Sequence, residues 1–440
     1  MAGRVIPIAG HVPEPADAPL AGRPPTDGAI RFARLPPLSL YIHIPWCVRK
    51  CPYCDFNSHE ARGDPDYEAY VDALIGDVEA ALPLIWGRPV ESLFLGGGTP
   101  SLLPVAALAR LLDALRARLP LQPDLEVTLE ANPGTADEAR FAGYAAAGVN
   151  RVSLGVQSFD DAMLARLGRI HGGGDARRAL EAALRQVPRV NVDLMHALPG
   201  QSVAQAVEDV RIALGLGAGH VSAYQLTLEP NTAFAAAPPD GLPDADRAAD
   251  IAAAVEATLA EAGLEHYETS AHARRGEPCR HNLNYWTFGD YLGIGAGAHG
   301  KLSFADRILR HVRFRHPRVY LQKAQERRTG RSGADAPSAA EGVVADDLGA
   351  WLPLEPDQTM EEVRPVAASD LPFEFAMNAL RLNDGFEVGL FPAHTGRPAS
   401  DLLGRLQEPV RRGLLTVVGG RVRPTTLGRR HLNEALTPLL

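Results

Sequence analysis

Short apolar runs typical of β-strands alternate, over the first half of the chain, with longer runs whose apolar positions recur at helical spacing. Residues 67–84 and 105–119 show the helical pattern, and Pro104 suits a helical first turn. Six strand and helix units in succession predict a parallel sheet curled into a barrel or part of one. The predicted strands are residues 38–44, 91–95, 125–130, 151–157, 190–195 and 220–228.

The pattern changes near the C-terminus. Residues 322–368 are rich in Gly, Ala, Ser and acidic side chains and show little periodicity, so we expect a variable linker there. Periodicity then resumes, and residues 369–440 are expected to form a small helical, winged-helix-like domain. Its predicted elements are helices at 371–382, 399–412 and 427–439 and a hairpin at 414–423 that turns at Gly419 and Gly420.

Residues 1–37 are rich in Pro, Gly and Ala and lack the apolar core of a signal peptide, so we expect a disordered tail. The whole chain has 440 residues, 46% hydrophobic and 22% charged, as in globular proteins. No apolar run approaches the roughly 18 residues that a membrane helix needs. A net charge of −9 argues against a general nucleic-acid binder.

Three of the four cysteines, Cys47, Cys51 and Cys54, follow the first predicted strand with the spacing C-x3-C-x2-C. This crowding, without an export signal, disfavours disulfides and predicts metal binding in the cytoplasm. Three thiolates in one short loop can hold a [4Fe-4S] cluster and leave its fourth iron without a protein ligand. That iron can chelate S-adenosylmethionine (SAM), whose reductive cleavage gives a 5′-deoxyadenosyl radical. The alternatives are buried free thiols or a zinc site completed by His43 or Cys279.

A glycine-rich turn that contains Gly97, Gly98 and Thr99 follows the second predicted strand. Its exposed backbone N–H and C=O groups suit a ligand's amino group or ribose, although such a turn is often only a connection. Glu130, which ends the third strand, is a candidate for the ribose or amino group of SAM. Arg169 is a candidate for a carboxylate.

Further polar residues fall at the ends of later strands, where barrels of this type form their active sites. As a set around one rim they favour a ligand site, but each alone is equally well explained as a satisfied rim residue or helix cap. These residues are Gln157, Asp193, Tyr224, Gln225 and Thr227.

Residues 279–286 concentrate a thiol, an imidazole and two aromatic rings. His281, Tyr285 and Trp286 are therefore candidate contacts to a flat macrocycle such as haem, and none of them is assigned as an axial ligand. The alternative is a turn that packs an aromatic ring against the barrel. Arginines near the C-terminus raise a nucleic-acid interpretation, which the predicted fold does not by itself support. They are Arg405, Arg411, Arg412, Arg421, Arg423, Arg429 and Arg430.

Together these motifs resemble the radical SAM family of oxygen-independent coproporphyrinogen III dehydrogenases and, within it, the HemW branch of haem chaperones. The resemblance covers about residues 38–315, including a His-Asn-x-x-Tyr-Trp segment, and resumes at 373–382. It implies an α/β fold, an incomplete (β/α)6 barrel followed by a small helical, winged-helix-like domain. It also implies residue roles. Tyr41, Gly97 and Glu130 would contact the cluster-bound SAM, Tyr53 would lie beside the cluster, and Gly98, Thr99, Gln157, Arg169 and Asp193 would surround a second SAM.

One position separates the two branches. The dehydrogenase resembles this chain but has a further Cys two residues after the third cluster thiol, where this chain carries Phe56. The resemblance therefore favours a chaperone that binds haem and passes it to apoproteins, which could include respiratory enzymes. The dehydrogenase remains the alternative, and the pattern leaves open whether the chain is an enzyme. We expect neither a nucleic-acid partner nor an integral membrane segment.

Overall fold

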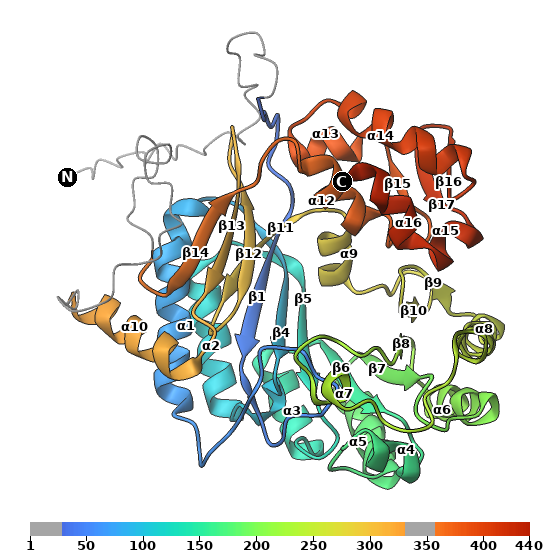
Figure 1. Cartoon of the computed structure of the whole chain (residues 1–440). Coiled ribbons are helices and arrows are strands. Elements are labelled where there is room, and N and C mark those ends of the chain that lie inside the picture. The colour runs from blue at the N-terminus through green and yellow to red at the C-terminus, as the bar shows by residue number, and fades with distance from the viewer. Residues whose placement is uncertain (1–28, 331–356) are drawn as a thin grey trace, which may run out of the picture.

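A computed structural model describes residues 29–330 and 357–440 of the chain. Figure 1 shows a strongly curved sheet with helices on its outer face and a second, mostly helical unit beside one end of it. Much of the expected tail, residues 1–28, and of the expected linker, residues 331–356, lies outside the described residues.

The large sheet has twelve strands, and the seven in its middle run parallel. Six of these seven match the predicted strands, and β11 joins them as a neighbour of β1. The two edge strands, β14 and β9, do not pair with each other, so the prediction of an incomplete barrel is confirmed. The parallel strands are β1 (Leu38–Ile44), β4 (Val90–Gly97), β5 (Leu121–Ala131), β6 (Arg151–Gln157), β7 (Arg189–His196), β8 (His220–Gln225) and β11 (Asp290–Ile294).

Antiparallel strands extend the sheet at both edges, and nothing in the hydrophobic pattern had predicted them. One edge carries β12 (His299–Ser303), β13 (Ile308–Arg313) and β14 (Met360–Pro365). The other carries β10 (Ala271–Ala273) and β9 (Glu265–His266). Because β14 belongs to this sheet, the expected linker is partly regular structure.

Several of the helices begin at side chains that cap them. Asp66, Asp137, Asp160, Ser202 and Asp244 each accept hydrogen bonds from the free N–H groups of a first turn. The helices of this part are α1 (Tyr67–Ala81), α2 (Val105–Arg118), α3 (Glu138–Ala147), α4 (Asp161–Arg166), α5 (Gly173–Gln186), α6 (Val203–Gly215), α7 (Ala233–Ala236), α8 (Ala245–Glu261), α9 (Arg280–Trp286) and α10 (Pro317–Thr329).

Alternation along the parallel strands separates an apolar outer face from a polar inner face. Outward side chains such as Ile42, Leu129 and Val192 join one buried core with the surrounding helices. The intervening positions therefore point to the inner face, and most of them are polar. They include Tyr41, His43, Glu126, Glu130, Ser153, Asn191, Asp193, His220 and Tyr224. A polar inner face in a sheet this apolar on its outer side predicts that ligands are held inside the curve.

The C-terminal unit has its own buried core. Its predicted hairpin is present, but the single last helix was wrong, because the chain breaks at His431 into two short helices and a 3-10 turn. Ile30 and Phe32, expected in the tail, are buried in this core. The elements are α12 (Leu371–Ala379), β15 (Phe386–Glu387), α13 (Leu390–Thr395), α14 (Ala399–Arg411), β16 (Leu415–Val418), β17 (Arg421–Pro424), α15 (Thr426–Arg430), α16 (Leu432–Leu436) and η3 (Thr437–Leu439).

Two surface properties bear on the class of protein. None of the described helices combines the length and the apolar character needed to cross a bilayer. Several of the C-terminal arginines are already paired, since Arg412 contacts Glu434 and Arg421 contacts Glu387. This pairing weakens the nucleic-acid interpretation, because neutralised arginines attract phosphates poorly.

Candidate cluster and cofactor site

The three clustered cysteines lie on the loop that leaves the C-terminal end of β1. Cys47 ends the short strand β2 (Trp46–Cys47), which pairs in parallel with β3 (His59–Glu60) and so closes the loop on itself. Within the loop the backbone N–H of Cys54 donates to the carbonyl of Cys51 at 3.1 Å. All three thiols are half-buried and free of disulfides. The loop therefore presents three candidate metal ligands from eight consecutive positions at the rim of the sheet.

Polar groups from distant parts of the chain meet these sulfurs. The Thr99 hydroxyl donates to Cys47 Sγ at 3.3 Å, and Arg169 Nη1 donates to Cys51 Sγ at 3.5 Å. Burial raises the pKa of the Cys47 and Cys54 thiols. Donors at the sulfurs offset that effect, because they stabilise thiolates, and an iron–sulfur cluster takes its cysteines as thiolates.

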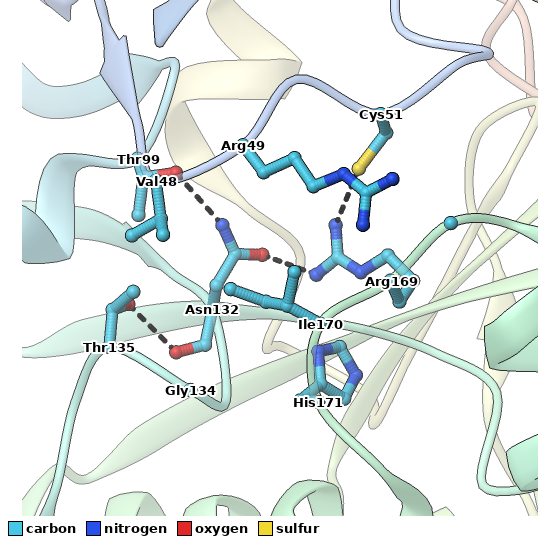
Figure 2. A pocket seen from close by; sticks show the side chains of 11 residues that line it. Val48, Arg49, Cys51, Thr99, Asn132, Gly134, Thr135, Arg169, Ile170 and His171 are labelled. Atoms are coloured by element: carbon cyan, nitrogen blue, oxygen red, sulfur yellow. Dashed lines mark hydrogen bonds between the residues drawn. The ribbon is translucent and has the colours of Figure 1, made fainter. Parts of the chain in front are cut away.

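Arg169 and Thr99 are joined by Asn132, which the sequence analysis missed. Figure 2 shows the Arg169 guanidinium between Cys51 and the Asn132 side chain, in a pocket that Val48 and Ile170 also line. Arg169 Nη2 donates to Asn132 Oδ1 at 2.6 Å, and Asn132 Nδ2 donates to Thr99 Oγ1 at 3.0 Å. The sequence did hold one indication of Asn132, because this residue follows directly after the third predicted strand.

The pocket retains an unused donor. Arg169 Nε is buried and has no hydrogen-bond partner among the described residues, although Arg169 also donates to the carbonyl of Gly155 at 2.7 Å. An unpaired buried donor is costly, so a bound group with an acceptor oxygen would stabilise this arrangement. The site therefore fits a ligand with a carboxylate or hydroxyl beside the cysteine loop.

The glycine turn lets β4 approach the cysteine loop. Gly97 has a φ of +113°, and a Cβ there would lie 2.5 Å from the His43 ring. A Cβ at Gly98 would lie 2.7 Å from the carbonyl oxygen of Trp46. The glycines are thus required by close packing, while the Gly97 N–H also donates to Glu130 Oε2 at 3.1 Å.

Two acidic groups lie together on the inner face. Burial and the neighbouring Asp193 raise the pKa of Glu130 to about 8. Burial also raises the pKa of Asp193, although Ser153 Oγ and Asn191 Nδ2 donate to its carboxylate at 3.0 and 2.8 Å. A cationic ligand would stabilise both carboxylates in their charged forms, and SAM carries an ammonium and a sulfonium.

Replacing Glu130 by Gln should raise the stability of the apoprotein at alkaline pH and lower its affinity for SAM. The carboxyl has a pKa of about 8 in the folded chain and 4.5 as a free group. It therefore stabilises the fold below pH 4.5, and this contribution is lost as the pH rises to 8. Since one pKa unit is worth about 1.4 kcal/mol, the apoprotein of E130Q should exceed the parent in unfolding free energy by at least about 1 kcal/mol at pH 8.5.

Urea unfolding of both apoproteins at pH 4.5 and pH 8.5 measures this difference, and the exposed Glu91→Gln is the matched control. SAM affinity should fall in E130Q because a charged acceptor has been removed. A parallel loss of stability at both pH values would contradict the assignment of a buried, protonated carboxyl.

The remaining predicted residues are placed around the same rim or behind it. Tyr53 lies beside Cys51, and burial raises the pKa of its phenol. Gln157 ends β6 with a φ of +68°, a conformation that is uncommon outside glycine. Strand β8 ends at Gln225, so Thr227 lies in the following loop, where it donates to Glu229.

Neither residue that was considered as the fourth ligand of a zinc site is available. Both ring nitrogens of His43 are engaged, Nδ1 with the Tyr41 hydroxyl at 3.0 Å and Nε2 with the carbonyl of Asn57 at 2.8 Å. Cys279 is buried against Glu126 near the opposite ends of the strands. In the part of the chain that the structure describes, no three His, Cys, Asp or Glu side chains converge on a single-ion position.

The aromatic segment forms α9, a helix rather than a turn, and it lies against the inner face of the sheet (Figure 1). His281 is buried, stacks on Phe94 with ring centroids 4.9 Å apart, and has its Nδ1 3.2 Å from Ser92 Oγ. Tyr285 is 37% exposed. The structure therefore separates the three haem candidates, because His281 is covered and Tyr285 can be reached from solvent.

Comparison with known proteins agrees with this geometry. Residues 41–213 match the model of the radical SAM superfamily, and residues 366–431 match the HemN C-terminal domain. The chain is 47% identical to Heme chaperone HemW of Escherichia coli over 92% of this chain and 98% of that protein. This chain belongs to the HemW family of radical SAM proteins. A [4Fe-4S] cluster and SAM are thus implied by the family, and the donor set of the cysteine loop fits them.

Two further relatives and a solved structure extend the comparison. Heme chaperone HemW of Haemophilus influenzae is 41% identical over 92% of this chain and 98% of that protein. A mitochondrial radical S-adenosyl methionine domain-containing protein 1 of Bos taurus is 43% identical over 65% of this chain and 64% of that protein. The structure of E. coli coproporphyrinogen III oxidase (HemN) aligns with a TM-score of 0.73 at 22% identity, covering 92% and 90% of the two chains. That likeness establishes the shared fold.

Proposed function

We propose that this protein binds haem together with a SAM-ligated [4Fe-4S] cluster and transfers the haem to acceptor apoproteins in the cytoplasm. The observation that carries the proposal is the 47% identity, across nearly the whole of both chains, to a protein named as a haem chaperone. The exposed Tyr285 ring of α9, on the inner face of the sheet, supports it. The dehydrogenase alternative has only the likeness of fold to HemN in its favour.

We infer that Cys47, Cys51 and Cys54 hold the cluster, which when bound supplies an electron and an open iron for the methionine end of SAM. Tyr41, Gly97 and Glu130 are proposed to bind the adjacent SAM. A second SAM is proposed to lie near Gly98, Thr99, Gln157, Arg169 and Asp193. The unpaired Arg169 Nε and the half-buried acids, Glu130 and Asp193, support these assignments, because none of these groups has the ionic partner that a zwitterionic sulfonium would supply.

For haem, Tyr285 and Trp286 are the proposed contacts on α9. Their rings are perpendicular, with centroids 5.2 Å apart, and Tyr285 packs on Tyr291 at 5.0 Å. Such rings can stack on a porphyrin edge or face. His281 lies one turn earlier and would have to leave its place against Phe94 before it could reach an iron.

A haemin titration tests the proposal. The anaerobically reconstituted protein should shift the Soret band of haemin with a stoichiometry near one. Substitution of Trp286 and Tyr285 together by alanine should weaken binding at least about tenfold, or ~1.4 kcal/mol. Trp86→Ala is the matched control, because Trp86 is 84% exposed at a turn before β4 and should leave the affinity unchanged.

An unchanged haemin spectrum at stoichiometric protein would reject haem binding. A parallel anaerobic incubation with dithionite, SAM and coproporphyrinogen III examines the dehydrogenase alternative. Conversion to protoporphyrinogen would favour that enzyme, and intact substrate would count against it.

A further inference from the structure

One wall of the inner face is lined by basic side chains. The pairing of β12 with β13 sets His299 opposite Val312 and Lys301 opposite Arg310. Tyr291 of β11 is opposite Lys301 and lies beside Ser39 of β1, which shares the inner face with Tyr41. By this alternation His299, Lys301 and Arg310 all project to the inner side of the sheet.

Two of these cations already have ionic partners. Lys301 is buried in an ion pair with Asp290 at 2.8 Å. Arg310 contacts Glu374 of α12 through Nη2 at 2.6 Å and through Nε at 3.0 Å. The charge of each is therefore already compensated, and neither is available to pair with an anionic ligand.

Two other basic side chains are exposed and form no ion pair. Arg315 follows the end of β13, and it is exposed, as is His299. Among the described residues the side chains of Arg315 and His299 form no ion pair, and the nearby Glu362 is paired with Arg364 at 3.2 Å. This wall therefore carries positive charge that the rest of the described chain does not neutralise.

The same wall connects α9 with the cysteine loop. Arg310 Nη1 donates to the Tyr291 hydroxyl at 3.2 Å, and Tyr291 packs on Tyr285 of α9. At the other end the carbonyl of Arg315 accepts from Asn57 Nδ2 at 3.0 Å, while Asn57 also accepts from His43. The main chain places Arg315 near His299, because the Arg313 N–H donates to the carbonyl of Ala298 and the Gly297 N–H donates to the carbonyl of Phe314, both at 3.0 Å. Burial, and after it the charges of Arg315 and Arg310, lower the pKa of His299.

The opposite wall carries acidic side chains. Glu130 and Asp193 project inward from β5 and β7, and Glu268, between β9 and β10, is buried with its pKa raised to about 7. Tyr224 stands near these acids and is still 42% exposed. These carboxyls offer a carboxylate ligand no positive charge, so its carboxylates would be attracted to the wall of β12 and β13.

We propose that Arg315 and His299, with the Arg310–Glu374 pair behind them, form a subsite for the carboxylates of the bound porphyrin. The inference rests on the proposed function and goes beyond it, because it fixes the orientation of the macrocycle. The propionates point toward β12 and β13, and the ring lies toward Tyr285. Arg315 supplies the permanent charge, and His299 supplies a hydrogen-bond donor.

Esterification of the ligand provides the test. Haemin and haem dimethyl ester, in which both propionates are blocked, are titrated against the parent protein and against a double variant, Arg315→Gln with His299→Gln. Haemin affinity should fall at least about tenfold in the variant, and affinity for the ester should change by less than about twofold. Both sites are exposed, so we expect the variant to fold normally. Arg318→Gln, an exposed cation on α10, is the matched control and should change neither affinity.

The outcomes distinguish the subsite from haem binding itself. Equal losses for haemin and for the ester would overturn the subsite, because the effect would then not act through the carboxylates. Unchanged haemin affinity in the double variant would overturn it as well, while haem binding would stand. If the parent protein bound neither ligand, the proposed function would fail, and the subsite with it.

Discussion

Substituting alanine for Cys47, Cys51 and Cys54 together should remove the iron–sulfur chromophore almost completely. The parent chain, reconstituted without oxygen, should hold about four iron atoms and absorb near 400 nm, as expected for a [4Fe-4S] centre. The variant should retain less than about a tenth of that iron, since the loop loses every ligand that it presents. Iron analysis and absorbance spectra of both proteins, prepared in parallel, measure the difference.

The fourth cysteine supplies the matched control. Cys279 is buried against Glu126, near the opposite ends of the strands from the cluster loop, so Cys279→Ala should keep its iron and its spectrum. Undiminished iron and absorbance in the triple variant would contradict the assignment of the site. If Cys279→Ala lost its iron while it stayed folded, Cys279 would be an iron ligand, and the proposed site would be wrong.

Replacing Asp77 by alanine should lower the free energy of unfolding by about 3–5 kcal/mol, the range for removing one partner of a buried ion pair. Asp77 on α1 contacts Arg313 of β13 at 3.0 Å and Arg327 of α10 at 2.9 Å. Tyr320 also donates to it at 2.7 Å. The Arg313 side chain has no exposed surface, so its charge would lose its main support, with Asp357 as the remaining partner.

Asp72→Ala is the control on the same helix. Asp72 is 42% exposed and pairs with Arg110, which is 43% exposed, and exposed pairs contribute about 0–1 kcal/mol. Urea unfolding of both variants at pH 7 compares the two positions. A loss below about 1 kcal/mol for Asp77→Ala would show that the network of α1, α10 and β13 does not hold the edge of the sheet.

The elements that the sequence predicted correctly are those in which buried apolar residues recur regularly within a single segment. The six strands are apolar on the outer side, and α1 and α2 carry apolar residues at helical spacing, so each signal lies within one segment. The antiparallel strands β12 to β14 were not predicted because charged inward side chains interrupt their apolar pattern, and because β14 lies far along the chain from its partner β13. The break at His431 was not predicted either, since the helical spacing of apolar residues continues across it.

The site shows the same division. Adjacency in the chain was enough to find the cysteine loop, the glycine turn and the rim acids, because a strand end places the next few residues at the rim. Asn132 and the contact between Arg169 and Cys51 depend on three separate segments meeting. The burial of His281 likewise follows from packing against Phe94, far earlier in the chain.

The sequence by itself determined the order of the central strands and helices, the cysteine loop proposed to hold the cluster and the family, because these depend on short spacings and on local periodicity. Only the tertiary structure decided which polar groups face one another. The opposition of a cationic wall on β12 and β13 to the acids of β5 and β7 arises from the curvature of one sheet. Curvature brings together residues more than a hundred positions apart in the chain, and a local sequence pattern cannot predict which of them will meet.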